Sequence, residues 1–299
     1  MNFKTPEIHA LSPRNWVDYE LLDSGDGAKL ERFGKYTLVR PDKGILWHRS
    51  VAAETWKQAD AEFVPAEAGE GRWMLKREFP EQWRMRYGNL SFWARLTPFR
   101  HTGVFPEQAP HWDWLIEKIK SAKRPVSVLN LFAYTGIATL AAASAGASVT
   151  HVDASKPTIA WARENALVAG LADRPIRWML DDALKFVRRE GRRGKRYNGI
   201  IIDPPVFGRG PKGEVWRFAK SFPALIEACQ AILSEQPLFV ITTAYEVAES
   251  SLLLSNLLAD WLGSSGGTIS AGELILQPKT GNRPLSTSVY ARWARAEAF

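Results

Sequence analysis

The chain has 299 residues, of which 45% are hydrophobic and 24% charged, and a formal net charge of +7. No apolar run approaches the about 18 residues that a transmembrane helix needs, and the amino terminus lacks the apolar core of a signal peptide. We therefore expect a cytoplasmic protein with no membrane partner. Its single cysteine, Cys229, excludes an internal disulfide and a cysteine-rich zinc site, and we expect no metal. The positive charge favours a polyanionic partner without proving one.

Residues 1–100 differ in character from the rest of the chain. Eight of the thirteen tryptophans precede residue 115, and short β-like segments recur at Tyr36–Arg40, Ile45–His48, Trp73–Lys76 and Leu90–Leu96. Clusters of glycine, aspartate and proline precede the first two segments, as is typical of turns. We predict a small, mostly β N-terminal domain over residues 1–100, with a possible role in RNA recognition.

Basic and aromatic residues are interleaved in the second half of this domain. Such a pattern can bind RNA through phosphate contacts and base stacking. It also fits a small β domain with an aromatic core, which suits most of the rings better. The residues concerned are Arg72, Lys76, Arg77, Arg84, Arg86, Arg95 and Arg100, with Trp73, Trp83, Phe92 and Trp93.

Strands and helices alternate over residues 101–299, which predicts an α/β domain with a parallel sheet and right-handed crossovers. The expected strands are Val126–Phe132, Ala147–Val152, Ile176–Leu180, Tyr197–Ile202, Leu238–Thr243, Thr268–Gln277 and Ser286–Ala294. The expected helices are Gln108–Ser121, Ile137–Ala145, Lys156–Ala169, a helix opened by Asp181 and Asp182, Phe218–Leu233 and Tyr245–Leu262.

The most informative segment is Asp203-Pro204-Pro205-Val206-Phe207, directly after an apolar strand. Proline offers no N–H to a sheet, so the chain must leave the strand there in a stiff, extended loop. Ligands bind at the carboxyl ends of the strands in open α/β sheets. An acid and a ring at that position predict a clamp for a flat, polar substrate; the alternative is a turn that merely ends the strand.

Another acid, Asp153, follows the second predicted strand of this domain, about 20 residues after the first turn, where a carboxylate suits a ribose diol. The first turn contains only one glycine, Gly136, and the dinucleotide fingerprint is absent. A pyrophosphate therefore has no obvious backbone cradle. The pattern predicts a nucleoside site without a diphosphate.

Four ordered motifs resemble the class I S-adenosylmethionine-dependent methyltransferases: Asn130–Gly136, His151–Ser155, Asp181–Ala183 and Asp203–Phe207. They are most similar to the bacterial 23S rRNA large-subunit methyltransferases, a group that includes cytosine-C5 and guanine-N7 enzymes. The run His101–Gln108 resembles the group's motif on the cofactor side. The resemblance covers residues 101–299 and implies a Rossmann-like seven-stranded sheet with an antiparallel last strand. It also implies S-adenosyl-L-methionine as cofactor and 23S rRNA as partner.

The resemblance assigns roles to individual residues. Asp153 would hold the ribose hydroxyls and Asp182 the adenine amine, while Asp203 and Phe207 would be the catalytic residues that face the acceptor. The methionine end would be lined by Asn130, Phe132, Thr135 and Gly136. The full set expected to bind the cofactor is Phe105, Gln108, Asn130, Phe132, Tyr134, Thr135, Gly136, Asp153, Ser155, Asp181, Asp182, Asp203 and Pro204.

Two of these interpretations have structural alternatives. Asp181 and Asp182 could both be helix N-caps. The basic run Lys185–Arg196 could bind RNA, or could be a solvated helix terminus where cations suit the helix dipole.

The sequence differs from the cytosine-C5 methyltransferases at one position that bears on the acceptor atom. C5 methylation needs a thiolate that adds to the ring, and the segment Val240–Tyr245 lacks the expected cysteine. Cys229 falls within a predicted helix, as a small buried hydrophobe would. We therefore predict methylation of a base nitrogen of RNA. The alternatives are methylation of a protein side chain or small metabolite, and a non-catalytic RNA-binding assembly factor.

Overall fold

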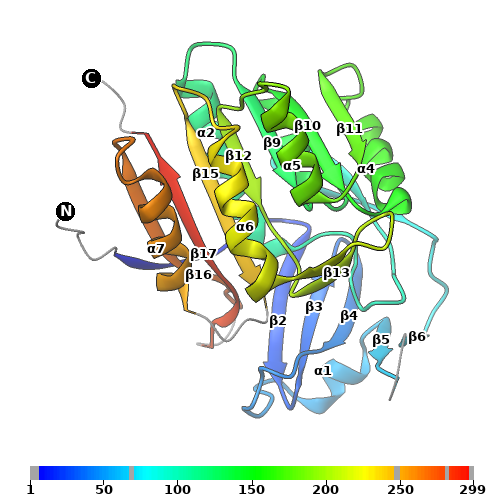
Figure 1. The fold of residues 1–299 in the computed structure, drawn as a ribbon. Helices are drawn as coiled ribbons and strands as arrows, with labels where there is room; N and C mark the ends of the chain where they lie inside the picture. Colours follow the sequence, from blue (N-terminus) through cyan, green and yellow to red (C-terminus); the bar gives the residue numbers. More distant parts are fainter. Residues whose placement is uncertain (1–6, 67–70, 246–249, 280–282, 296–299) are drawn as a thin grey trace. The chain divides into compact units, whose positions relative to one another are not determined.

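The computed structural model describes residues 7–66, 71–245, 250–279 and 283–295, and divides the chain into two compact units (Figure 1). The larger unit comprises residues 1–11, 110–274 and 287–299, and the smaller comprises residues 12–109 and 275–286. Residues 8–11 thus belong to the larger unit, although the sequence analysis groups them with the N-terminal domain. Within the described ranges no helix is long and apolar enough to cross a membrane.

The larger unit is built on an eight-stranded sheet. In spatial order its strands are β1 (Ile8–Leu11), β16 (Thr268–Leu276), β17 (Leu285–Ala294), β15 (Phe239–Tyr245), β12 (Gly199–Ile202), β9 (Ser127–Leu131), β10 (Ser148–Asp153) and β11 (Ile176–Leu180). Strand β9 lies between β10 and β12, so the strand order reverses there. Such a reversal is the switch point at which open α/β sheets bind ligands.

The predicted Rossmann-like methyltransferase sheet is confirmed, including its antiparallel strand, because β17 runs antiparallel to β15. Strand β1 is an addition that the sequence analysis missed. It pairs in parallel with β16 through Ile8 and Ala271 at the edge of the sheet. Three of its four residues are exposed, so its sequence carries no core-facing alternation.

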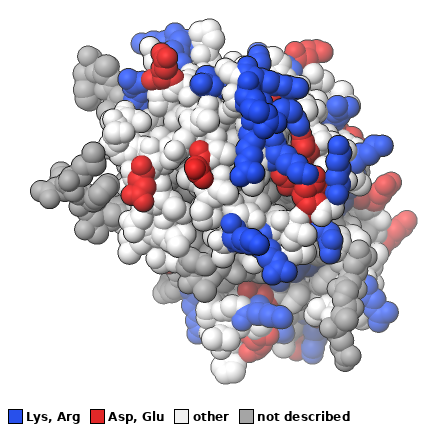
Figure 2. Space-filling model, viewed as in Figure 1, with Lys and Arg blue, Asp and Glu red and all other residues white. Residues whose placement is uncertain are grey.

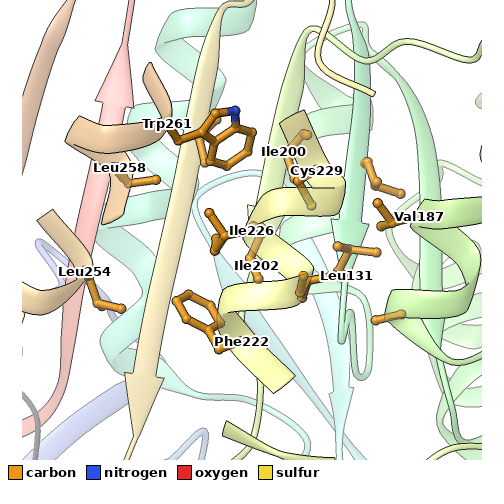
Figure 3. Close-up of a cluster of buried hydrophobic side chains, with 14 of the residues drawn as sticks. Leu131, Val187, Ile200, Ile202, Phe222, Ile226, Cys229, Leu254, Leu258 and Trp261 are labelled. Atoms are coloured by element: carbon orange, nitrogen blue, oxygen red, sulfur yellow. The ribbon is translucent and has the colours of Figure 1, made fainter. Parts of the chain in front are cut away.

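Three helices cover the face of the sheet that Figure 1 presents: α5 (Ala183–Arg192), α6 (Phe218–Gln230) and α7 (Ser251–Leu262). Their apolar sides meet the central strands in one buried cluster, in which Phe222 and Ile226 of α6 lie over Ile200 and Ile202 of β12 (Figure 3). Each fully buried aliphatic side chain contributes about 1.5–3 kcal/mol. The remaining helices of the unit are α2 (Ala109–Ser121), α3 (Ile137–Ser144) and α4 (Lys156–Val168).

The smaller unit contains a five-stranded sheet and a separate two-stranded hairpin. The mostly β character that the sequence predicts is therefore confirmed. The sheet is made of β2 (Tyr19–Gly25), β3 (Ala28–Phe33), β4 (Tyr36–Pro41), β5 (Ala61–Val64) and β6 (Arg72–Leu75), and the hairpin of β7 (Trp83–Tyr87) and β8 (Leu90–Ala94). The unit also contains α1 (Ala53–Lys57) and the 3-10 turn η1 (Pro106–Gln108).

The predicted strand Ile45–His48 is wrong. Its backbone bonds to turns rather than to a strand: Ile45 N donates to the Asp42 carbonyl at 3.2 Å, and the Ile45 carbonyl accepts from Gly27 N at 3.1 Å. Ile45 is buried, whereas Leu46 is 90% exposed. The segment therefore packs as a loop against the β2–β3 turn.

Most rings of the smaller unit form its core. This agrees with the prediction of a small β domain with an aromatic core. Trp16 and Tyr87 are buried with ring centroids 4.8 Å apart, and Phe92 is fully buried. A buried ion pair lies in the same unit, where Glu31 accepts two bonds of 2.7 Å from Arg40 and one of 2.8 Å from the Tyr19 hydroxyl. These contacts satisfy a carboxylate that burial alone would penalise.

Candidate active site

The turn between β9 and α3 has an unusual backbone. Three alternate residues have positive φ values: Phe132 at 56°, Tyr134 at 49° and Gly136 at 84°. Left-handed conformations cost free energy in non-glycine residues and concentrate at ligand sites. A Cβ at Gly136 would lie 3.0 Å from the Ala162 Cβ, so the turn is also pressed close to α4. The signature turn of the sequence is thus a shaped, constrained loop.

Buried polar side chains support this turn from below. Asn130, 2% exposed, donates from Nδ2 to Thr139 Oγ1 at 3.0 Å, and Thr139 Oγ1 lies 3.0 Å from His151 Nδ1. Asn165 Nδ2 donates to the Thr135 carbonyl at 2.9 Å. Burial lowers the pKa of His151 to about 3, so this ring is neutral and acts as a structural partner. The amide of Asn130 thus contacts α3, and its predicted contact with the cofactor stays a prediction.

Asp153 is the last residue of β10 and lies half-buried beside the turn. Its Oδ2 accepts from Tyr134 N at 2.8 Å and its Oδ1 accepts from Ser155 N at 2.9 Å. Burial raises the pKa of the carboxyl, and the N–H groups of Ser155 and Tyr134 oppose that rise. Hydroxyl donors from a ribose would relieve the remaining desolvation cost, so the site fits the nucleoside end of S-adenosylmethionine.

The two acids after β11 differ in their contacts. Asp182 is the N-cap of α5, because its Oδ1 accepts from Lys185 N at 2.9 Å. Asp181 accepts from Asp182 N at 2.9 Å and forms an ion pair with Arg189 at 2.5 Å. Ser155 is also a cap, on α4, with Oγ accepting from Thr158 N at 3.4 Å. The capping alternative is therefore realised for Asp182, through one of its two oxygens.

Asp203 and the two prolines follow β12 at the same edge of the sheet. The Thr243 hydroxyl, from the neighbouring strand β15, donates to Asp203 Oδ1. Pro204 is buried, while Pro205 is exposed and Phe207 is 53% exposed. The acid is thus fixed by a neighbouring strand, and the ring beyond it faces solvent.

The short hairpin that begins at Phe207 was not predicted from the sequence. Strand β13 (Phe207–Arg209) pairs antiparallel with β14 (Val215–Arg217). Trp216 Nε1 donates to the Pro205 carbonyl at 2.7 Å, and its ring centroid lies 4.7 Å from that of Phe132. The available signal was the turn Gly210-Pro211-Lys212-Gly213, with Phe207 before it and Val215 and Trp216 after it.

Phe105 and Gln108 belong to the smaller unit, whereas the other predicted site residues belong to the larger one. Gln108 closes η1, with its backbone N donating to the Phe105 carbonyl at 3.1 Å. The Phe105 ring lies 5.1 Å from the His101 ring. Their part in cofactor binding stays a prediction.

The carboxyl edge of β9, β10 and β12 therefore combines a constrained turn, a backbone-held carboxylate and a fixed acid beside a ring. Strand β9 pairs with β10 on one side and β12 on the other, so Gly136, Asp153 and Asp203 follow three adjacent strands at the same edge of the sheet. A turn without a glycine-rich phosphate cradle and an acid suited to a ribose match a nucleoside cofactor without a diphosphate.

Comparisons with known proteins agree with this chemistry. A family model described as S-adenosylmethionine-dependent methyltransferase matches residues 47–234. The ribosomal RNA large subunit methyltransferase K/L of Pseudomonas paraeruginosa is 31% identical over 206 residues, which cover 67% of this chain and 26% of that protein. The chain thus spans about a quarter of the length of that relative.

Solved structures extend the match to nearly the whole chain. The SAM-dependent methyltransferase from Agrobacterium tumefaciens is 44% identical with a TM-score of 0.92, covering 98% of this chain and 97% of that one. A structure described as a methyltransferase complexed with S-adenosylhomocysteine has a TM-score of 0.72 at 21% identity, covering 94% and 76%, and supports the fold alone. The chain belongs to the S-adenosylmethionine-dependent methyltransferase family and is a methyltransferase that uses this cofactor.

Proposed function

We propose that this enzyme methylates a base nitrogen of RNA, with 23S rRNA as the substrate. The observation that carries the proposal is the loop after β12, in which Thr243 fixes Asp203 while the exposed Phe207 ring follows two prolines. A base drawn out of its stack needs an aromatic surface, and stacking of this kind contributes about 1–3 kcal/mol. The name of the Pseudomonas relative supports ribosomal RNA.

Different residues of the candidate site would bind the cofactor and the RNA base. When bound, S-adenosylmethionine supplies an electrophilic methyl group on a sulfonium. Asp153 would hold the ribose hydroxyls, and Asp182 would accept from the adenine amine with the oxygen that does not cap α5. The turn Phe132–Gly136 would enclose the methionine end. Asp203 would accept a hydrogen bond from the base edge, and proximity of donor and acceptor lowers the barrier by about 7–11 kcal/mol.

A nitrogen acceptor agrees with the environment of the only cysteine. Cys229 is fully buried on α6 against the sheet (Figure 3), and burial raises the pKa of its thiol. A thiolate nucleophile would need an exposed, electropositive setting. A ring nitrogen or exocyclic amine has its own lone pair and requires no covalent help from the protein.

The proposal is tested by transferring labelled methyl groups to 23S rRNA from a strain that lacks the gene, followed by mass spectrometry of the nucleosides. We expect one nucleoside with a nitrogen-bound methyl group. A 5-methylcytosine product, or a covalent adduct between Cys229 and RNA containing 5-fluorocytosine, would overturn the nitrogen assignment. Methylation of a protein or metabolite but no RNA would overturn the substrate.

Two loop variants refine this test under single-turnover conditions at saturating cofactor. Phe207→Ala should weaken RNA binding by about 1–3 kcal/mol together with turnover. Asp203→Asn keeps an oxygen for the Thr243 hydroxyl but removes the charge, so it should lower turnover more than RNA affinity. Both should bind the cofactor as the parent does. If both variants methylate RNA at the parental rate, the loop only ends the strand and does not take part in the reaction.

A further inference from the structure

The β13–β14 hairpin has two chemically different faces. Side chains alternate along each strand, so the cross-strand pairs Phe207–Arg217 and Arg209–Val215 share one face, and Gly208–Trp216 occupies the other. Phe207 and Val215 are 53% and 54% exposed, and both arginines are exposed as well. Trp216 is buried, at 5% exposure. One face therefore presents a ring, methyl groups and cations to solvent, while the other anchors the hairpin.

The buried face fixes the hairpin in place. Trp216 holds the Pro205 carbonyl through Nε1 at 2.7 Å and packs on Phe132 of the cofactor turn. Phe218 N donates to the Val206 carbonyl at 2.9 Å, which closes the base of the hairpin. A Cβ at Gly208 would reach 3.4 Å from Pro205 Cγ, so the inner face lies close against the Pro-Pro loop. These contacts hold the hairpin in one conformation, so its outer face can bind a ligand with little loss of conformational entropy.

The single acid of the hairpin is neutralised within the protein. Glu214 accepts from Lys185 Nζ of α5 at 2.7 Å and from Lys212 N at 2.8 Å. The hydrogen bond from Lys185 lowers the pKa of Glu214 to about 2, so it is ionised and paired at neutral pH. The outer face therefore carries the charge of Arg209 and Arg217 without a competing carboxylate of its own.

We infer that this outer face binds the single-stranded RNA next to the methylated base. Arg209 and Arg217 would contact phosphates, and Val215 would support a neighbouring base beside the acceptor on Phe207. Cations flanking apolar and aromatic surface are the combination that single strands require, because phosphates and base faces are offered together. The face lies directly after Asp203, so bound nucleotides would lead into the site. The inference rests on the proposed RNA substrate.

The test compares two charge-matched double variants of the full chain. Arg209→Gln with Arg217→Gln removes the outer-face cations. Lys120→Gln with Arg174→Gln removes two exposed cations that precede β9 and β11, at the opposite edge of the sheet. Affinity for a single-stranded rRNA fragment is measured against salt. The hairpin variant should lower the slope of log K against log salt by roughly 1.4, because each phosphate contact on a single strand contributes about 0.7.

The control variant should keep the parental slope, and both variants should keep the parental cofactor affinity. If the parent methylates rRNA and the hairpin variant binds with the parental slope, the inference is wrong and the proposed function stands. If the parent neither binds nor methylates RNA, the proposed function is wrong and the inference falls with it. A hairpin variant that binds RNA duplex less well but single strands as the parent does would also overturn the inference.

Discussion

The two edges of the eight-stranded sheet differ in chemistry. At the carboxyl edge lie the left-handed turn and the carboxylates of Asp153, Asp182 and Asp203. At the amino edge Asn198 joins neighbouring strands, with its Oδ1 accepting from Ser127 N at 2.9 Å and its carbonyl accepting from Leu238 N at 2.6 Å. The carboxyl edge contains left-handed backbone and partly exposed carboxylates. At the amino edge, hydrogen bonds between uncharged groups join the strands. We therefore call the carboxyl edge, where we propose that the cofactor and RNA bind, the binding edge, and the amino edge the supporting edge.

The densest basic run of the sequence, Lys185–Arg196, starts at the binding edge and leads away from it to the supporting edge. Helix α5 starts at the carboxyl edge, runs back across the sheet and ends at Arg192, shortly before β12 begins. Figure 2 shows lysines and arginines gathered over α5. Part of the run is structural, because the buried Glu190 accepts from Arg193 at 3.3 Å and from the Tyr197 hydroxyl at 2.8 Å. We therefore infer the position of the site from the direction of the strands rather than from the density of charge along the sequence.

The largest expected effect comes from removing the carboxylate of the binding edge. Asp153→Ala should weaken S-adenosylmethionine binding by about 1.5–3 kcal/mol, roughly 10- to 150-fold, because the ribose no longer donates to a charged acceptor. Calorimetric titration measures this change. Asp173→Ala, an exposed acid just before β11 at the opposite edge, is the matched control and should bind as the parent does. Parental affinity in a folded Asp153→Ala protein would remove Asp153 from the cofactor site.

The same carboxylate predicts a pH dependence. Burial raises the pKa of Asp153 above its usual value of 3.8, and ribose hydroxyls donate most strongly to the ionised form. Cofactor affinity should therefore be complete above the raised pKa and fall as the pH drops through it, starting at a higher pH than for an ordinary aspartate. Titrations at successive pH values should show this decline in the parent and a flatter profile in Asp153→Ala. Identical profiles would assign the dependence to another group.

The sign is reversed for the stability of the cofactor-free protein. A carboxyl whose pKa is raised in the folded state stabilises the fold below its unfolded pKa, and that contribution is lost as the pH rises through the folded pKa. The binding edge thus gives up stability at neutral pH to keep an ionised acceptor. Ser155 and Tyr134, whose N–H groups hold the carboxylate, limit that cost.

Much of this edge could be predicted because its signals are local. The strand Ile176–Leu180 has the predicted bounds, and Ser155 and Asp182 cap helices as their positions suggest. Apolar runs followed at once by acids or prolines define where a strand stops. The carboxylates at those stops could therefore be found without coordinates.

Features that depend on distant residues could not be predicted. Strand β1 exists because β16, more than 250 residues later, offers it a parallel edge. The left-handed conformations of Phe132 and Tyr134 have no sequence signal, since neither is glycine. The bond from Thr243 to Asp203 joins two strands that only the register of β12 and β15 brings together. The three-residue strands of the hairpin are too short for a periodic pattern.

The smallest expected effect tests whether RNA reaches the supporting edge. Arg192, Lys195 and Arg196 are at the end of the basic run and carry charge toward solvent, whereas Arg193 is paired with Glu190 and is left unchanged. Helix α5 has 10 residues, so it ends about 15 Å from its start at the binding edge, and Lys195 and Arg196 lie beyond that end. A short RNA that holds only the methylated base and its immediate neighbours at the hairpin should not reach the end of the run, whereas a longer strand could, since single-stranded sites range from about 4 to 16 nucleotides.

We therefore expect the triple variant Arg192→Gln, Lys195→Gln, Arg196→Gln to bind the short RNA with the parental salt slope. With a long single strand its slope should fall by at most roughly 2.1, about 0.7 for each phosphate that is no longer neutralised. The hairpin variant, by contrast, should lower the slope for both lengths. Equal reductions on the short RNA in both variants would place the RNA along α5 and erase the distinction between the edges. A triple variant with the parental slope at every length would identify these three cations as part of a solvated helix terminus, in which only Arg193 is held by Glu190.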